Sequence, residues 1–168
     1  ADVFSKFRSE YSRRLYFLAE GEEPWLHEAG FDATYAWKLH HLLNDIAQGK
    51  AGADSLVRYV EWNATAYPSG SHRLTFVTNH DENSWSGTEY ERMGDAWKAM
   101  AVLCWTLPTA QPVIYTGQEV GYNHRFEFFG KAPMPEWHHH ATTDFYTYLN
   151  EVQHAHPALD SDNPSFEV

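Results

Sequence analysis

The sequence predicts an α/β protein built on a parallel sheet, because short apolar runs alternate along it with longer amphipathic segments. The apolar runs have the length of strands, and the amphipathic segments repeat their apolar residues at helical spacing. Strands that alternate with helices pair in parallel through right-handed crossovers. Roughly four such βα units fit into the 168 residues, which is also a common size for a single domain.

The first part of the chain supplies two predicted strands. A helix is expected over 2–15, where apolar residues recur on one face, and the apolar run 15–19 is expected to be a buried strand. This run ends abruptly at Glu20, in an acidic loop that contains glycine and proline. A second short strand is expected near 31–35.

Helices and strands continue to alternate in the rest of the chain. Helices are predicted over 37–46 and from residue 54 to the stop at 67–68, followed by a strand over 74–78. A capping box, Thr88 with Glu91, starts the next helix. The remaining predictions are an apolar helical stripe over 93–104, a strand over 112–115 and a final helix over 145–152 that stops at 156–157.

The composition limits the classes of partner. The net charge of −11 repels phosphate backbones and anionic lipids, so nucleic acid and membranes are not expected partners. No apolar run approaches the roughly 20 residues of a spanning helix, and no signal peptide is visible. The lone Cys104 is expected in the core and predicts no compartment. An aromatic fraction of 16% suits stacking on neutral sugars, although a large aromatic core has the same composition.

Polar side chains follow each predicted strand. In parallel α/β folds, ligands bind at the carboxyl ends of the strands, where side chains from several strands converge. Carboxylates with amide, imidazole and aromatic neighbours are the groups that glycoside hydrolysis requires. The four strand ends present Glu20, then Asp32 and Tyr35, then Asn79, His80 and Asp81, and finally Gln118 and Glu119.

Each of these residues also has a structural interpretation. Glu20 could be a solvated loop residue, as its neighbours Glu22 and Glu23 are expected to be. His80 could be a core histidine with satisfied hydrogen bonds, and Asp81 a helix or turn cap. The placement of all three at successive strand ends favours a functional site.

Four ordered segments of the chain resemble motifs of one enzyme family with a (β/α)8 barrel. The run 76–81, Phe-Val-Thr-Asn-His-Asp, resembles the strand-seven motif, and 17–20 resembles the strand-five motif. The segments 112–119 and 145–159 resemble strand eight and the helix that closes the barrel, and 31–35 lies where strand six belongs. The family that these segments resemble is the alpha-amylase family, glycoside hydrolase family 13. The resemblance implies strands five to eight, the C-terminal half of a TIM (β/α)8 catalytic barrel. It covers nearly the whole chain, 1–168, as one partial domain.

The resemblance also implies roles for individual residues. Glu20 matches the general acid and base, and Asp81 matches the residue that stabilises the oxocarbenium-like transition state. His80 matches the histidine that binds the sugar, and Asn79 precedes it in the same motif. From their loops, Trp85 and Tyr122 are predicted to stack on glucose rings. No metal ligand and no cofactor are predicted for this chain.

Carboxylate chemistry and the family resemblance predict different nucleophiles. Carboxylate chemistry alone suggests Glu20 and Asp81 as a retaining pair. The resemblance instead assigns the nucleophile to an aspartate on strand four, in a Gly-Phe-Arg-x-Asp motif that this chain lacks. The N-terminal half-barrel, the inserted calcium-binding domain and the C-terminal β-sandwich are likewise expected to lie outside it. We therefore expect the chain to be inactive alone and to associate, with itself or with the missing half, through unpaired strand edges.

Three functions fit these residues. The leading one is part of a retaining hydrolase that cleaves α-glucosidic bonds in starch-like glucans or maltooligosaccharides. A transglycosylase or isomerase of the same family shares the motifs, and the loops do not predict how well water is excluded. A non-catalytic carbohydrate-binding protein is the third, although sugar binding alone does not require Glu20, His80 and Asp81 together.

Overall fold

Four parallel strands form one sheet in the computed structural model, which describes residues 2–159. The strands follow one another in chain order across the sheet, and every neighbouring pair is parallel. The predicted α/β class and parallel sheet are therefore confirmed. The strands are β1 (Leu18–Ala19), β2 (Ala33–Tyr35), β3 (His72–Thr75) and β4 (Ala110–Pro112).

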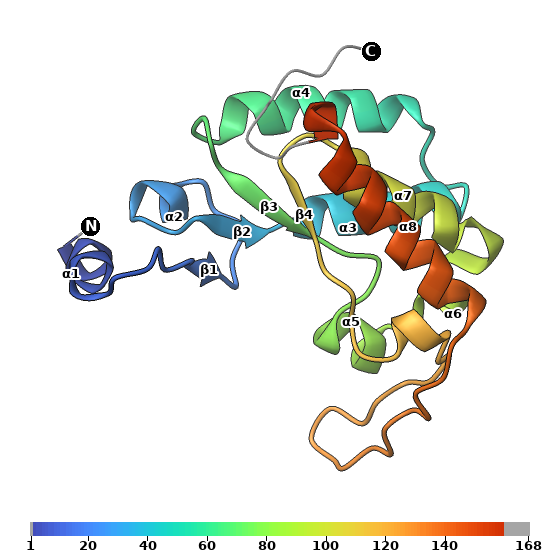
Figure 1. The fold of residues 1–168 in the computed structure, drawn as a ribbon. Helices are drawn as coiled ribbons and strands as arrows, with labels where there is room; N and C mark the ends of the chain where they lie inside the picture. Colours follow the sequence, from blue (N-terminus) through green and yellow to red (C-terminus); the bar gives the residue numbers. More distant parts are fainter. Residues whose placement is uncertain (1, 160–168) are drawn as a thin grey trace.

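Helices connect the strands and cover the sheet (Figure 1). In the figure, α1 and α2 lie beside the β1 end of the sheet, whereas α7 and α8 lie beside β4. A long loop after β4, drawn in orange, extends beyond α5. The helices are α1 (Asp2–Glu10), α2 (Trp25–Glu28), α3 (Trp37–Ala47), α4 (Asp54–Ala66), α5 (His80–Trp85), α6 (Glu89–Met93), α7 (Trp97–Thr106) and α8 (Ala141–Ala155). Short 3-10 turns span Gly94–Ala96, Gln118–Val120 and Pro157–Leu159.

Several predicted boundaries are wrong by a few residues. The first helix ends at Glu10 rather than at residue 15, and the third and fourth strands begin earlier than predicted. Phe76, Val77 and Thr78 are buried but lie past the paired part of β3, so burial extends beyond the hydrogen-bonded ladder. The helix predicted to continue from the Thr88 capping box is interrupted at Gly94, whose φ of 53° belongs to the left-handed region.

The core lies where α7 packs against α3 and α8. Trp97, Met100 and Cys104 of α7 contribute to it, together with Leu43 of α3 and Tyr146 of α8. Cys104 has no exposed surface, which confirms its predicted place in the core. Burial raises the pKa of its thiol, so the thiolate form is suppressed. No helix among residues 2–159 is both long and apolar enough to cross a membrane.

Glu22 is not the solvated residue that the sequence suggested. Its Oε1 lies 2.6 Å from Nη2 of Arg73, whose side chain is 1% exposed. The Lys38 amide also donates to the Glu22 carboxylate, and the Tyr67 ring lies 3.8 Å from the Arg73 guanidinium carbon. The expectation is wrong because Arg73 is a buried cation on β3 that requires an anionic partner. Glu22 thus helps to fix the loop that carries Glu20.

Candidate active site

Three side chains from two separate parts of the sequence meet at the carboxyl ends of the strands. Glu20 directly follows β1, whereas His80 and Asp81 begin α5 just after β3. Nε2 of His80 lies 3.4 Å from Oε1 of Glu20 and 3.6 Å from Oδ1 of Asp81. One polar atom from each of the three residues lies within 4.8 Å of the others. The structure therefore brings together the residues that the sequence placed at successive strand ends.

All three side chains are open to a ligand. Exposed fractions are 59% for Glu20, 46% for His80 and 34% for Asp81. His80 is therefore not a core histidine, and Asp81 is not the residue that caps α5. An imidazole between two accessible carboxylates can donate to sugar hydroxyls or exchange protons with its neighbours.

Asn79 holds the start of α5. Its backbone is extended, and its Oδ1 accepts a hydrogen bond of 2.8 Å from the amide of Glu82. This is an N-cap, which satisfies one of the free amides at the helix start. With 6% of its surface exposed, Asn79 positions His80 and Asp81 and presents almost no surface to a ligand. The side chain of Asn79 is therefore not accessible for the predicted contact with substrate.

The end of β2 adds Tyr35 to the site, but not Asp32. Burial raises the pKa of Tyr35, and the nearby carboxylates of Glu20 and Asp81 raise it further. The hydroxyl therefore stays protonated and can donate a hydrogen bond. Asp32 precedes β2, so it lies at the other end of the strand, where it pairs with Arg8 at 2.8 Å. Assigning Asp32 to the carboxyl end was wrong because the strand begins one residue later.

The residues after β4 stabilise the fold instead of joining the three-residue cluster. Gln118 is 3% exposed, donates from Nε2 to the Tyr146 hydroxyl at 3.0 Å and accepts from the Tyr115 amide at 2.6 Å. Glu119 accepts from the Gly117 amide at 2.9 Å through its carboxylate. These bonds tie the end of β4 to its own turn and to α8.

The two predicted stacking residues are placed differently. Trp85 ends α5 and is 64% exposed, and its ring centroid lies 5.1 Å from that of Phe128. Phe128 in turn lies 6.2 Å from the ring of His80, nearly parallel to it. Tyr122 instead contacts His124, at 5.1 Å, in its own loop. The structure therefore places Trp85 next to the cluster and connects it through Phe128, an exposed loop residue that carried no sequence signal.

A buried hydrogen bond holds α5 against α3. Nε2 of His40 lies 3.1 Å from Oε2 of Glu82, and the His40 side chain is 1% exposed. Burial lowers the pKa of His40, which favours the neutral ring. The hydrogen bond from His40 lowers the pKa of Glu82 to about 2, so a neutral imidazole donates to a carboxylate. Glu82 thereby anchors α5 to α3.

Acid should loosen this anchor. Because the folded-state pKa of His40 lies below the unfolded value of 6.5, the unfolded chain binds more protons, and stability falls as pH drops through 6.5. Glu82 adds a loss as pH falls from 4.5 towards about 2. We expect urea unfolding of His40→Gln to depend less on pH between 7.5 and 5.5 than the parent, by at most about 1.4 kcal/mol per pH unit. Equal slopes for the parent, His40→Gln and the exposed control His154→Gln would contradict this assignment.

The cluster also has the composition of a cation site. Two carboxylates and an imidazole are groups that bind zinc, and their polar atoms lie close enough to share one ion. Exposed acidic side chains also gather without any metal, and these three are all accessible. That this chain has no metal ligand therefore stays a prediction.

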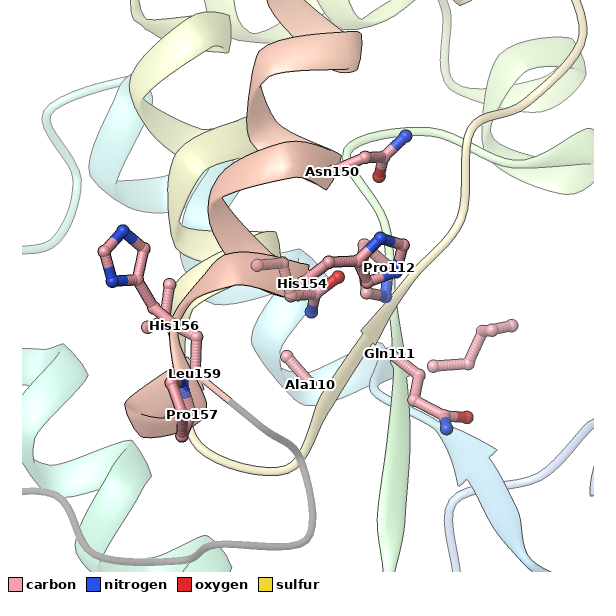
Figure 2. Close-up of a pocket in the computed structure, with 10 residues that line it drawn as sticks. Ala110, Gln111, Pro112, Asn150, His154, His156, Pro157 and Leu159 are labelled. Carbon is pink, nitrogen blue, oxygen red and sulfur yellow. The ribbon is translucent and has the colours of Figure 1, made fainter.

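A cavity of about 640 Å³ lies away from the cluster, between β4 and the end of α8. Figure 2 shows its lining, with Gln111 and Pro112 of β4 opposite Asn150 and His154 of α8. None of the three clustered residues lines it. Within the described residues β4 pairs only with β3, so the cavity follows an unpaired strand edge. We assign it to the edge of the sheet rather than to the active site.

Comparison with known proteins establishes the fold. No family model matches the chain, and no curated protein sequence matches it. Among solved structures, an alpha-amylase from Lactobacillus plantarum matches with a TM-score of 0.74 at 20% identity, over 99% of this chain and 42% of that one. A cyclic alpha-maltosyl-(1→6)-maltose hydrolase from Arthrobacter globiformis gives 0.75 at 23%, over 94% and 38%. A cyclomaltodextrinase gives 0.75 at 22%, over 94% and 29%.

These matches confirm the predicted architecture. The four βα units form a partial TIM barrel of the kind found in alpha-amylase-type enzymes, so the predicted resemblance holds for the fold. The chain spans less than half the length of these structures. At this level of identity the likeness concerns the fold, and the chemistry is argued from the site.

Proposed function

We propose that this chain supplies the acid–base part of the active site of a retaining glycoside hydrolase that acts on α-glucosidic bonds. The observation that carries the proposal is the convergence of Glu20 with His80 and Asp81 at the carboxyl end of a parallel sheet. Starch-like glucans and maltooligosaccharides are the proposed substrates. The likeness to amylases and to a cyclomaltodextrinase supports this choice.

Each residue of the cluster has a proposed role. Glu20 donates its proton to the leaving oxygen and then removes a proton from the incoming water. Asp81 accepts hydrogen bonds from sugar hydroxyls and stabilises positive charge at the anomeric carbon. His80 and the protonated hydroxyl of Tyr35 hold the same sugar ring from two further sides. All four groups come from the ends of three adjacent strands.

The nucleophile is proposed to come from outside this chain. The cluster contains two carboxylates within the described residues, and their oxygens lie within 4.8 Å. Retaining enzymes place the acid and the nucleophile about 5 to 5.5 Å apart, so distance alone allows Asp81 as the nucleophile. The strand-seven motif 76–81 favours the supporting role for Asp81 and assigns the attack to an aspartate on strand four. The complete barrel, meaning this chain joined to the half that supplies the other strands, would then be the active species.

Product analysis separates the three candidate functions. We expect the complete barrel to convert maltoheptaose into shorter oligosaccharides with new reducing ends. Longer products would identify a transglycosylase, and a rearranged heptasaccharide of unchanged mass would identify an isomerase. Binding without turnover would identify a carbohydrate-binding protein and contradict the hydrolase proposal.

Association through the edges of the sheet follows from the same proposal. β1 and β4 each pair with one strand within the described residues, and unpaired strand edges bind other strands. The cavity beside β4 leaves room along that edge (Figure 2). A second copy related by a two-fold axis, or the other half of the barrel, would pair with both edges.

A further inference from the structure

An exposed aromatic patch extends from the cluster. We define it as Trp85, Phe128 and Phe129, which are 64%, 38% and 88% exposed. Their rings contact one another, with centroids 5.1 Å apart for Trp85 and Phe128 and 4.7 Å apart for Phe128 and Phe129. Large apolar side chains gathered on a surface indicate a binding site. The proposed acid–base chemistry does not use this patch.

The loop that carries the two phenylalanines is tied to α5. Asn83, which is 3% exposed, donates from Nδ2 to the His124 carbonyl at 3.0 Å and accepts from the Phe126 amide at 2.8 Å. Arg125 and Glu91 form a further ion pair of 2.7 Å between this loop and α6. These bonds fix the loop relative to the helix that bears His80 and Trp85. A fixed surface loses little entropy when a ligand binds.

The patch is continuous with the candidate active site. The ring of Phe128 lies 6.2 Å from that of His80, with an angle of 28° between their planes. A ligand that contacts His80 therefore meets Phe128 and then Trp85. Figure 1 shows that the loop after β4, which carries both phenylalanines, extends beyond α5.

The surroundings of the patch favour a neutral ligand. The carboxylates of Glu20 and Asp81 lie beside it, and the chain has a net charge of −11, which disfavours phosphates and other anions. An aromatic face provides apolar contact for the C–H face of a sugar ring, whose hydroxyls remain free to bond elsewhere. A neutral sugar chain is thus the ligand class that fits both parts of the surface.

We infer that the aromatic patch is a stacking platform for a glucose unit of the substrate, next to the unit held by His80. The inference rests on the proposed function and deepens it, because it names residues that select a chain of several sugars over a single one. Trp85 supplies the largest ring, and the centroids of Phe128 and Phe129 lie 5.1 and 6.4 Å from it.

The test measures the binding of maltoheptaose to the 168-residue chain by a titration monitored with nitrogen–proton NMR spectra. We expect Trp85→Ala to weaken binding roughly tenfold or more, as alanine replacement of a central aromatic anchor usually does. Trp85→Phe should restore part of the affinity. Tyr148→Ala is the matched control, since Tyr148 is also 64% exposed but lies on α8. The spectra report in the same experiment whether each variant is folded.

The outcomes separate this inference from the proposed function. Equal affinities of the parent, Trp85→Ala and Phe129→Ala would overturn the platform and leave the hydrolase proposal intact. No binding of maltoheptaose by the folded parent would also overturn it, whereas the hydrolase proposal depends on turnover by the complete barrel. A patch that binds protein instead would show self-association that Trp85→Ala removes without any effect of the sugar.

Discussion

Replacing Glu20 with glutamine in the complete barrel should reduce the hydrolysis of unactivated maltooligosaccharides by roughly 100- to 10,000-fold. The substitution keeps the shape of the side chain but removes the proton that the leaving oxygen needs. Because Glu20 is 59% exposed, the change leaves no buried polar group unpaired, and stability should stay the same. A loss of activity would therefore reflect the missing proton donor and not unfolding.

A substrate with an activated leaving group provides the internal control. A glycosyl fluoride or an aryl glucoside with an acidic phenol needs little protonation, so its glycosylation step should be much less affected. Glu23→Gln is the matched variant, since this exposed glutamate lies three positions further along the same loop. Equal losses on both substrate types would remove Glu20 from the acid role.

The isolated chain should not hydrolyse maltooligosaccharides at a measurable rate. Its cluster presents the acid and the stabilising aspartate, but by our proposal the attacking carboxylate lies outside this chain. Water could attack directly, yet the sugar would be held on one side only, and a misplacement of about 1 Å can cost on the order of 100-fold. The absence of the nucleophile and the incomplete hold on the sugar both lower the rate of hydrolysis.

Mixing the two halves of the barrel tests this expectation. The purified chain is assayed on maltoheptaose alone and with the upstream half, while its mass in solution is measured. We expect no turnover alone, a dimer or larger species, and activity in the mixture. Robust turnover by a monomer of this chain would contradict both the assignment of the nucleophile and the expected association.

The fold could be predicted because the alternation of strands and helices is visible in hydrophobic periodicity. The limits of the strands could not be predicted, because they depend on the partner strands. Phe76 and Val77 are buried and apolar, but the paired residues are His72–Thr75. Helix α5 was also missed, since its six residues have no apolar period and begin at the Asn79 cap. A short helix of this kind is decided by capping rather than by pattern.

The candidate site could be predicted in part. Glu20, His80 and Asp81 were found because each follows an apolar run, and the structure brings them together. Phe128 was missed because an exposed aromatic residue in a loop has no pattern to distinguish it. The ion pair of Glu22 could not be predicted, because its partner, the buried Arg73, is remote in sequence and comes close only when the strands pair. The catalytic roles of Glu20, His80 and Asp81 are still predictions.

The position of the covalent intermediate reveals which half of the barrel supplies the nucleophile. A fluorinated glucosyl fluoride forms the bond between the nucleophilic carboxylate and the anomeric carbon while fluoride leaves, and the fluorine on the sugar slows the hydrolysis that follows. After reaction with the complete barrel, digestion and mass spectrometry identify the labelled peptide. We predict that the label lies outside residues 1–168, on an aspartate of the upstream half. A label on Asp81 would contradict the proposed role of Asp81, because this chain would then supply the nucleophile as well as the acid.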